Sequence, residues 1–151
     1  MTTEENKSLV RRMHEQVWNK GNVDILDELM SPDFVDSDAE AGFSLLGPAA
    51  PADGIAAAKQ AALAYRAAFA DLQFTFDDQV AEGDKVVTRW TATGTHTGPL
   101  GRIPPTGKHA TTTGIFIDRL AAGRVVEEWT NFDALGLLHQ LGVLPGPARS
   151  Q

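Results

Sequence analysis

The spacing of apolar residues changes once along this chain, and that change limits the folds it can adopt. In the first 70 residues apolar side chains recur every three or four positions, as Val10, Met13 and Val17 do, which indicates helices with one buried face. Between Leu72 and Asp77 apolar and polar residues alternate instead, which is typical of strands with one buried face. Because helices come first and consecutive strands follow, the order favours an α+β fold over alternating β-α-β units.

The two periods also predict where the elements lie. We expect strands at 72–81, 84–97, 108–120 and 124–132, joined by short turns into one antiparallel meander, and a brief strand at 33–36. Helices are expected at 4–20 and 54–70, with a terminal helix after Asp133. A short helix carrying Ile25 to Met30, capped by Asn22 or Asp24, should end at Ser31-Pro32. The Gly- and Pro-rich residues 39–53 are interpreted as a long loop that forms either a lid or a mobile surface segment.

Size and charge narrow the class of protein. A chain of 151 residues with 42% hydrophobic residues fits a single domain over 1–151, with its core at about 5–145. The formal net charge of −7 is the wrong sign for a nucleic-acid or anionic-membrane partner. The N-terminus is polar, and no stretch approaches the roughly 20 apolar residues of a membrane helix, so we expect a cytoplasmic protein.

The spacing of the histidines and glycines along the sequence matches no motif for metal or cofactor binding. The four histidines lie far apart in the chain, and none has a second histidine at the distance that places two imidazoles on one helical face (His14, His96, His109, His139). Gly94, Gly98 and Gly101 lie between predicted strands rather than at the start of a helix, so they do not form a phosphate loop. We therefore expect neither a metal nor a cofactor.

Aromatic residues are spread over nearly every predicted element, and most of them are expected to pack in the core. A pocket walled by a few of these residues, with a small number of polar groups, is the typical form of a small-molecule site. The partner predicted by this pattern is a small hydrophobic organic ligand.

Several short segments, taken in chain order, resemble the SnoaL-like polyketide cyclase family: Leu9-Val-Arg-Arg-Met, Trp18-Asn-Lys-Gly, Ser31-Pro-Asp-Phe, Gly94-Thr-His-Thr-Gly, Ile103-Pro-Pro-Thr-Gly-Lys, Gly123-Arg-Val-Val-Glu-Glu-Trp and Leu138-His-Gln-Leu-Gly. The family belongs to the superfamily of nuclear transport factor 2 and ketosteroid isomerase. The resemblance therefore implies a strongly curved antiparallel sheet that forms a cone, with helices packed on its concave face around a cavity. It also implies a homodimer through the outer face of the sheet.

The chain departs from this family at the two positions best known for its chemistry. The founding members close a ring by an intramolecular aldol reaction without metal or cofactor, and they carry an aspartate on the last strand and a histidine on the strand before it. A gapless alignment through the Gly123 turn places Thr130 and Phe116 at those positions. Neither side chain is titratable near neutral pH, so both groups of the usual acid/base pair are missing.

Other side chains must carry any acid/base chemistry. Asp133, where the last strand meets the last helix, and His96, beside the loop at 98–107, are the catalytic candidates. Each has a structural alternative, because aspartate is a strongly preferred helix N-cap and a histidine in a turn can bond to the backbone. The candidates for binding the ligand are Trp18, Phe34, Tyr65, Trp90, Thr112, Phe116, Glu128 and Thr130.

Three functions remain open at this stage. The leading hypothesis is cofactor-independent cyclase- or isomerase-type acid/base chemistry on a hydrophobic, polyketide-like metabolite. A ligand-binding module without turnover is the first alternative, and an epoxide-hydrolase-like or hydratase-like enzyme on the same fold is the second. A carboxyl group with a raised pKa near the cavity would favour an enzyme, whereas the missing aspartate and histidine favour the binding module.

Overall fold

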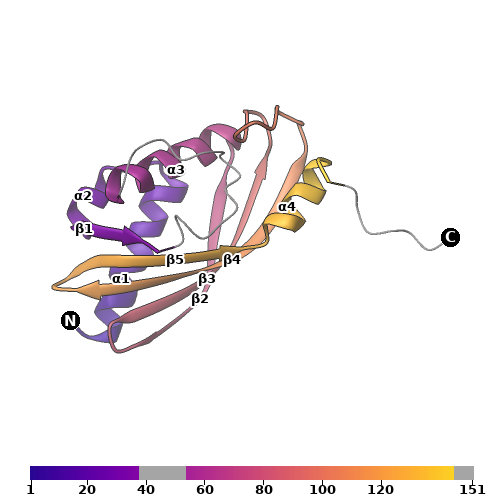
Figure 1. Ribbon diagram of the computed structural model, residues 1–151. Helices are drawn as coiled ribbons and strands as arrows, with labels where there is room; N and C mark the ends of the chain where they lie inside the picture. Colours follow the sequence, from indigo (N-terminus) through magenta and orange to yellow (C-terminus); the bar gives the residue numbers. More distant parts are fainter. Residues whose placement is uncertain (38–53, 145–151) are drawn as a thin grey trace.

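A computed structural model describes residues 1–37 and 54–144, and it shows a curved, unclosed five-stranded sheet with helices over its concave face (Figure 1). The predicted lid at 39–53 lies outside the described residues. The strands are β1 (Met30–Asp36), β2 (Gln73–Glu82), β3 (Lys85–Thr95), β4 (His109–Ala121) and β5 (Arg124–Phe132). The helices are α1 (Thr3–His14), η1 (Glu15–Asn19), α2 (Ile25–Leu29), α3 (Gly54–Ala68) and α4 (Ala134–Leu141). This confirms the predicted α+β class.

The strand order is β1-β5-β4-β3-β2, and the four long strands pair antiparallel as predicted. The first strand differs, because β1 pairs parallel with β5. The sequence prediction that placed Met30 in the short helix was wrong: α2 ends at Leu29, and Met30 is extended and pairs with Val125. The proposed side-chain cap of that helix was also wrong, since Asp24 makes no cap hydrogen bond and its carboxylate lies 3.4 Å from the Lys59 ammonium.

The first helix continues into a π-helical turn before it ends. The α1 helix starts with a capping box in which Thr2 Oγ1 accepts from the Glu5 N–H at 3.1 Å and the Glu5 carboxylate accepts from the Thr2 N–H at 2.9 Å. Its last residue is His14, and the turn η1 that follows contains Trp18. Such π turns often occur at functional sites. None of the described helices is long and apolar enough to cross a membrane.

Side chains from two other elements hold this turn against the sheet. The amide of Asn19 pairs with the β2 backbone, accepting from the Phe74 N–H at 2.6 Å and donating to the Phe74 carbonyl at 3.0 Å. Arg66 on α3 donates to the Trp18 carbonyl at 2.7 Å. Gly21 makes room for that guanidinium: its φ is +69°, and an added Cβ would lie 2.8 Å from Arg66 Nε. The indole of Trp18 is thereby fixed over the concave face.

The core includes two apolar clusters with a polar layer between them, and a third apolar cluster contains residues of α4. On β4 the inward side chains are, in order, Phe116, Asp118 and Leu120, all buried. Phe116 belongs to an aromatic cluster with Phe74 and Trp90, whereas Leu120 belongs to the cluster beneath α1 and α2. Asp118 lies between the two clusters, so a carboxyl group occupies the middle of the sheet.

The outer face of the sheet carries Trp129, which the strand alternation predicts to point outward. Its ring is half-buried, and the Lys85 ammonium lies 5.6 Å from the ring centroid. This distance permits a cation–π contact, which covers part of the ring within a single chain.

Gly114 provides a test of the packing around Trp90. The two residues are opposite each other on β3 and β4, and a Cβ at Gly114 would lie 2.2 Å from Trp90 Cζ2. We expect Gly114→Ala to lower the free energy of unfolding by about 1–3 kcal/mol through overpacking. In a Trp90→Phe background the added cost should be much smaller, because phenylalanine lacks the atoms that clash. Urea denaturation of the four proteins measures both costs, and equal costs in the two backgrounds would contradict this account.

Candidate functional site

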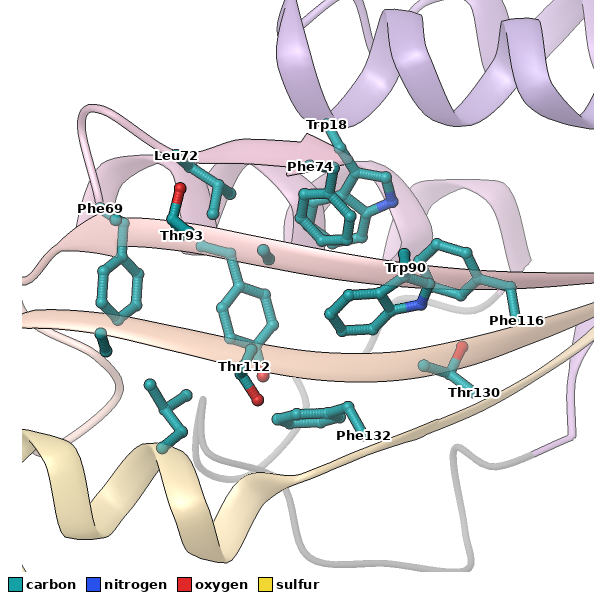
Figure 2. A pocket seen from close by; sticks show the side chains of 15 residues that line it. Trp18, Phe69, Leu72, Phe74, Trp90, Thr93, Thr112, Phe116, Thr130 and Phe132 are labelled. Carbon is teal, nitrogen blue, oxygen red and sulfur yellow. The ribbon is translucent and has the colours of Figure 1, made fainter. Parts of the chain in front are cut away.

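An apolar cavity of about 100 Å³ opens inside the aromatic cluster (Figure 2). An apolar cavity of this order can accept a small aromatic molecule. Six of the eight residues predicted to bind a ligand line it: Trp18, Tyr65, Trp90, Thr112, Phe116 and Thr130. They come from η1, α3, β3, β4 and β5, so the cavity is built by the same packing that closes the helices over the sheet.

Two of the predicted ligand-binding residues do not line the cavity. Phe34 is buried on β1 in the cluster beneath α1 and α2, because its strand pairs at the far edge of the sheet beside β5. Glu128 lies on β5 two residues before Thr130, and its side chain contacts the wall rather than forming it.

The two predicted catalytic residues also lie outside the cavity lining. Asp133 is the N-cap of α4, where its Oδ1 accepts from the Gly136 N–H at 2.9 Å. His96 is buried beside the loop that follows β3, and its Nδ1 accepts from the Thr106 N–H at 3.2 Å. Burial lowers the pKa of His96. Both side chains thus make the local structural contacts that the sequence analysis gave as alternatives.

A different titratable group lies next to the aromatic cluster. Asp118 and Glu128 are directly opposite on β4 and β5, and both face inward. His14, at the end of α1, places its Nε2 2.9 Å from Asp118 Oδ2 and 3.8 Å from Glu128 Oε2. The His14 ring stacks on Phe116 with a centroid distance of 4.0 Å. We call His14, Asp118 and Glu128 the acid cluster.

The pKa values of the acid cluster are shifted by its burial. Burial raises the pKa of Asp118 to about 6, and a hydrogen bond with Glu128 opposes this shift by lowering the pKa. Burial, and then the neighbouring Asp118, raise the pKa of Glu128 well above its ordinary value. Burial lowers the pKa of His14. These shifts favour a state in which Asp118 and Glu128 share one proton beside a neutral His14, since two carboxylates opposite each other on neighbouring strands would repel.

A hydroxyl group joins the acid cluster to the cavity. Thr130 lines the cavity, and its Oγ1 donates to Glu128 Oε1 at 3.5 Å. A continuous set of polar contacts thus runs from the cavity wall through Thr130 and Glu128 to Asp118 and His14. This arrangement can pass a proton between the cavity and the acid cluster.

The acid cluster also offers ligand atoms for a cation. One nitrogen of His14 and one oxygen each of Asp118 and Glu128 lie within 4.8 Å of one another. A nitrogen and two carboxylate oxygens form a donor set that Zn²⁺ accepts, so these residues could hold a divalent cation in place of the shared proton. The sequence expectation of no metal site depended on histidine spacing along the chain, which does not register a group assembled from one helix and two strands.

Part of the acid cluster was visible in the sequence pattern. Strict alternation along the fourth strand from Phe116, which faces inward, also places Asp118 inward. His14 lies one turn before Trp18 on the same helical face, next to the apolar stripe that contains Val10 and Met13. The register that brings the two carboxyl groups opposite each other comes only from the structure.

Comparisons with known proteins agree with this architecture. The sequence model of the SnoaL-like polyketide cyclase family matches residues 8–141. The chain is similar to TsrD from Streptomyces laurentii, with 28% identity, a TM-score of 0.80 and coverage of 95% of this chain and 99% of that one. It is also similar to IdmH from Streptomyces antibioticus, a candidate polyketide cyclase, with 31% identity, a TM-score of 0.71 and coverage of 91% and 98%.

A third similar structure is AclR from Streptomyces galilaeus, a candidate hydroxylase, with 28% identity, a TM-score of 0.78 and coverage of 98% of this chain and 87% of that one. No curated protein sequence matches this chain significantly.

The protonated state of Glu128 can be tested through stability. In the unfolded chain Glu128 titrates near its ordinary value of 4.5, whereas in the folded chain its pKa is raised. Between these two values the folded state binds more protons, so stability falls as pH rises, by about 1.4 kcal/mol for each unit of pKa difference. Glu128→Gln mimics the protonated side chain and removes this dependence.

We therefore expect Glu128→Gln to have a higher Tm than the wild type at pH 8, and the difference should shrink as pH falls toward 4. Thermal unfolding across this pH range measures it. A variant that is less stable than the wild type at pH 8 would contradict the assignment of the proton to Glu128.

Proposed function

The chain belongs to the SnoaL-like polyketide cyclase family, and on that premise we propose that it catalyses cofactor-independent, cyclase- or isomerase-type proton transfer on a small, hydrophobic, polyketide-like molecule. The observation that supports this proposal is the contact between Thr130, on the cavity wall, and the partly buried Glu128, whose pKa is raised. A carboxyl group with a raised pKa can act as an acid or a base near neutral pH.

The proposed step moves one proton through three side chains. In the inward direction the Thr130 oxygen takes a proton from a carbon next to the ligand's carbonyl group, while its own hydroxyl proton passes to Glu128 Oε1. The proton already on Glu128 then passes to the Asp118 carboxylate, so the acid cluster gains one proton and the ligand becomes an enolate. In the outward direction the same atoms return the proton to the ligand.

The neighbouring groups favour this transfer. Asp118 is the ionised member of the pair at neutral pH, because its pKa is the less strongly raised. The cavity wall around Thr130 is mainly apolar, which excludes water that would compete for the proton. In this proposal the acid cluster takes over from the family's aspartate and histidine at the next inward-facing pair of the same two strands, since Asp118 and Glu128 lie two positions beyond the pair Phe116 and Thr130 in the register.

One observation favours a second function, ligand binding without turnover. Tyr65 is the one titratable side chain among the residues found to line the cavity, and burial raises its pKa to about 12, so it stays neutral. The acid cluster reaches the ligand only through the Thr130 hydroxyl. A direct measurement of proton transfer on a bound ligand separates the two functions.

Exchange of a carbon-bound proton provides that measurement. The probe is 2-tetralone, a small aromatic ketone with acidic protons next to its carbonyl group, followed by ¹H NMR in D₂O with the buffer rate subtracted. We expect the wild type to accelerate the exchange and Glu128→Gln to slow the catalysed rate by about a hundredfold, the typical contribution of a general acid or base.

Glu127→Gln is the matched control. It is the neighbouring glutamate on β5, and its carboxylate contacts Arg119 at 3.1 Å and Ser37 instead of the acid cluster. Its exchange rate should equal that of the wild type. If 2-tetralone binds but exchanges no faster than in buffer, the chain is a binding module and the proposed catalysis is wrong. Equal losses in both variants would also contradict the assigned role of Glu128.

A further inference from the structure

The indole nitrogen of Trp90 is a buried donor without a partner. Trp90 lines the cavity and is only 4% exposed. Within residues 1–37 and 54–144, no acceptor lies within hydrogen-bonding distance of its Nε1. A buried N–H that is left unpaired is unfavourable because it has lost its hydrogen bonds to water, so an acceptor brought by a ligand would be bound favourably there.

The packing around Trp90 fixes the direction of this donor. The ring lies against the backbone of Gly114, where a Cβ would come within 2.6 Å of Cε2, the carbon bonded to the indole nitrogen. Phe74 and Phe116 pack on it, with ring centroids at 4.7 and 5.3 Å. Figure 2 shows the indole among the other aromatic side chains of the cavity, with its nitrogen on the edge toward Thr130. Because the ring cannot turn freely, the N–H is prearranged for one acceptor position.

We propose that the Trp90 Nε1–H donates a hydrogen bond to the carbonyl oxygen of a flat aromatic ketone bound in the cavity. The aromatic walls favour a planar ring, and the single N–H matches a single oxygen. No Lys, Arg or His belongs to the lining that the structure describes, so a carboxylate ligand would be left without a counter-charge. The proposal rests on the proposed function, in which this oxygen gains negative charge as the enolate forms.

The donor then has a catalytic role as well as a binding role. A hydrogen bond aimed at an oxygen that gains charge is stronger in the transition state than in the bound ketone. Trp90 supplies this bond while Thr130 and the acid cluster exchange the proton at the neighbouring carbon.

The test uses two ligands that differ in the oxygen alone. 2-Tetralone has the carbonyl group, and tetralin is the corresponding hydrocarbon. In the ¹⁵N-labelled wild type, the indole N–H resonance that disappears in Trp90→Phe belongs to Trp90. We expect 2-tetralone to move this proton resonance strongly downfield and tetralin to leave it nearly unchanged, as measured by ¹H–¹⁵N NMR.

Affinities give an independent readout. Trp90→Phe should weaken the binding of 2-tetralone about tenfold more than the binding of tetralin, the loss expected for one buried hydrogen bond. Trp129→Phe, on the outer face, is the matched control and should change neither affinity. Equal losses for both ligands, or a Trp90 resonance that responds equally to both, would overturn the proposal.

These binding measurements need no turnover. If 2-tetralone shifts the Trp90 resonance but its protons do not exchange, the proposed catalysis fails while the binding site stands. If exchange is catalysed but the Trp90 resonance does not respond to the carbonyl group, the proposed catalysis stands and the proposed Trp90 hydrogen bond is wrong. If Trp90→Phe does not fold, Trp18→Phe and Trp129→Phe assign the other two indole resonances of the chain, and the comparison of the two ligands on the wild type still decides the matter.

Discussion

The hydrogen bond between His14 and Asp118 connects the first helix to the middle of the sheet, and the arrangement of the concave side depends on it. The two atoms are 2.9 Å apart, and both side chains are buried. On one side of this bond lies the apolar cluster beneath α1 and α2, and on the other side lies the aromatic cluster. Because a buried carboxyl group needs a partner, the helix is held at one position along the sheet. That position also carries the π-helical turn, and with it Trp18, to the cavity wall.

The same constraint gives the site its chemistry. A carboxyl group in the middle of an apolar sheet faces a second one across the β4–β5 ladder, and both cannot be ionised there. We propose that the two groups share one proton, and the Thr130 hydroxyl, which donates to Glu128, connects the pair to the edge of the cavity. Acid/base capacity is therefore compatible with the replacement of the family's aspartate and histidine that the gapless alignment implies. The two carboxyl groups form the next inward-facing pair along the same strands, with a histidine from the first helix.

The sequence predicted the fold class, the four antiparallel strands and six of the fifteen residues that line the cavity, because the alternation of apolar residues is a local property that strands keep in the folded state. It did not predict the parallel pairing of β1, the extended Met30 or the π-helical turn, since these depend on contacts between distant segments.

In the candidate site, too, local patterns could be read from the sequence and contacts between distant segments could not. The alignment placed Phe116 and Thr130, alternation from them placed Glu128 inward, and the same rule applied to Asp118 would have found a second member of the acid cluster. Its assembly with His14 could not be found, because 104 positions separate the two residues in the chain. The emphasis on Asp133 and His96 came from their places next to predicted loops and helix ends, where capping and turn contacts occupy them in the structure.

The central claim is that Asp118 and Glu128 share one proton at neutral pH, and the side-chain carboxyl ¹³C shifts of the two residues test it most directly. When the unliganded protein is titrated by NMR, the two shifts should change together with pH as a coupled pair. The apparent pKa should be about 6 for Asp118 and well above the ordinary value for Glu128. Glu127 is an internal reference, because its hydrogen bonds to Ser37 and Arg119 lower its pKa. Addition of Zn²⁺ should leave the raised values in place, whereas ionisation of both groups would show that a cation replaces the proton. Two independent titrations near pH 4 in the metal-free protein would contradict the account.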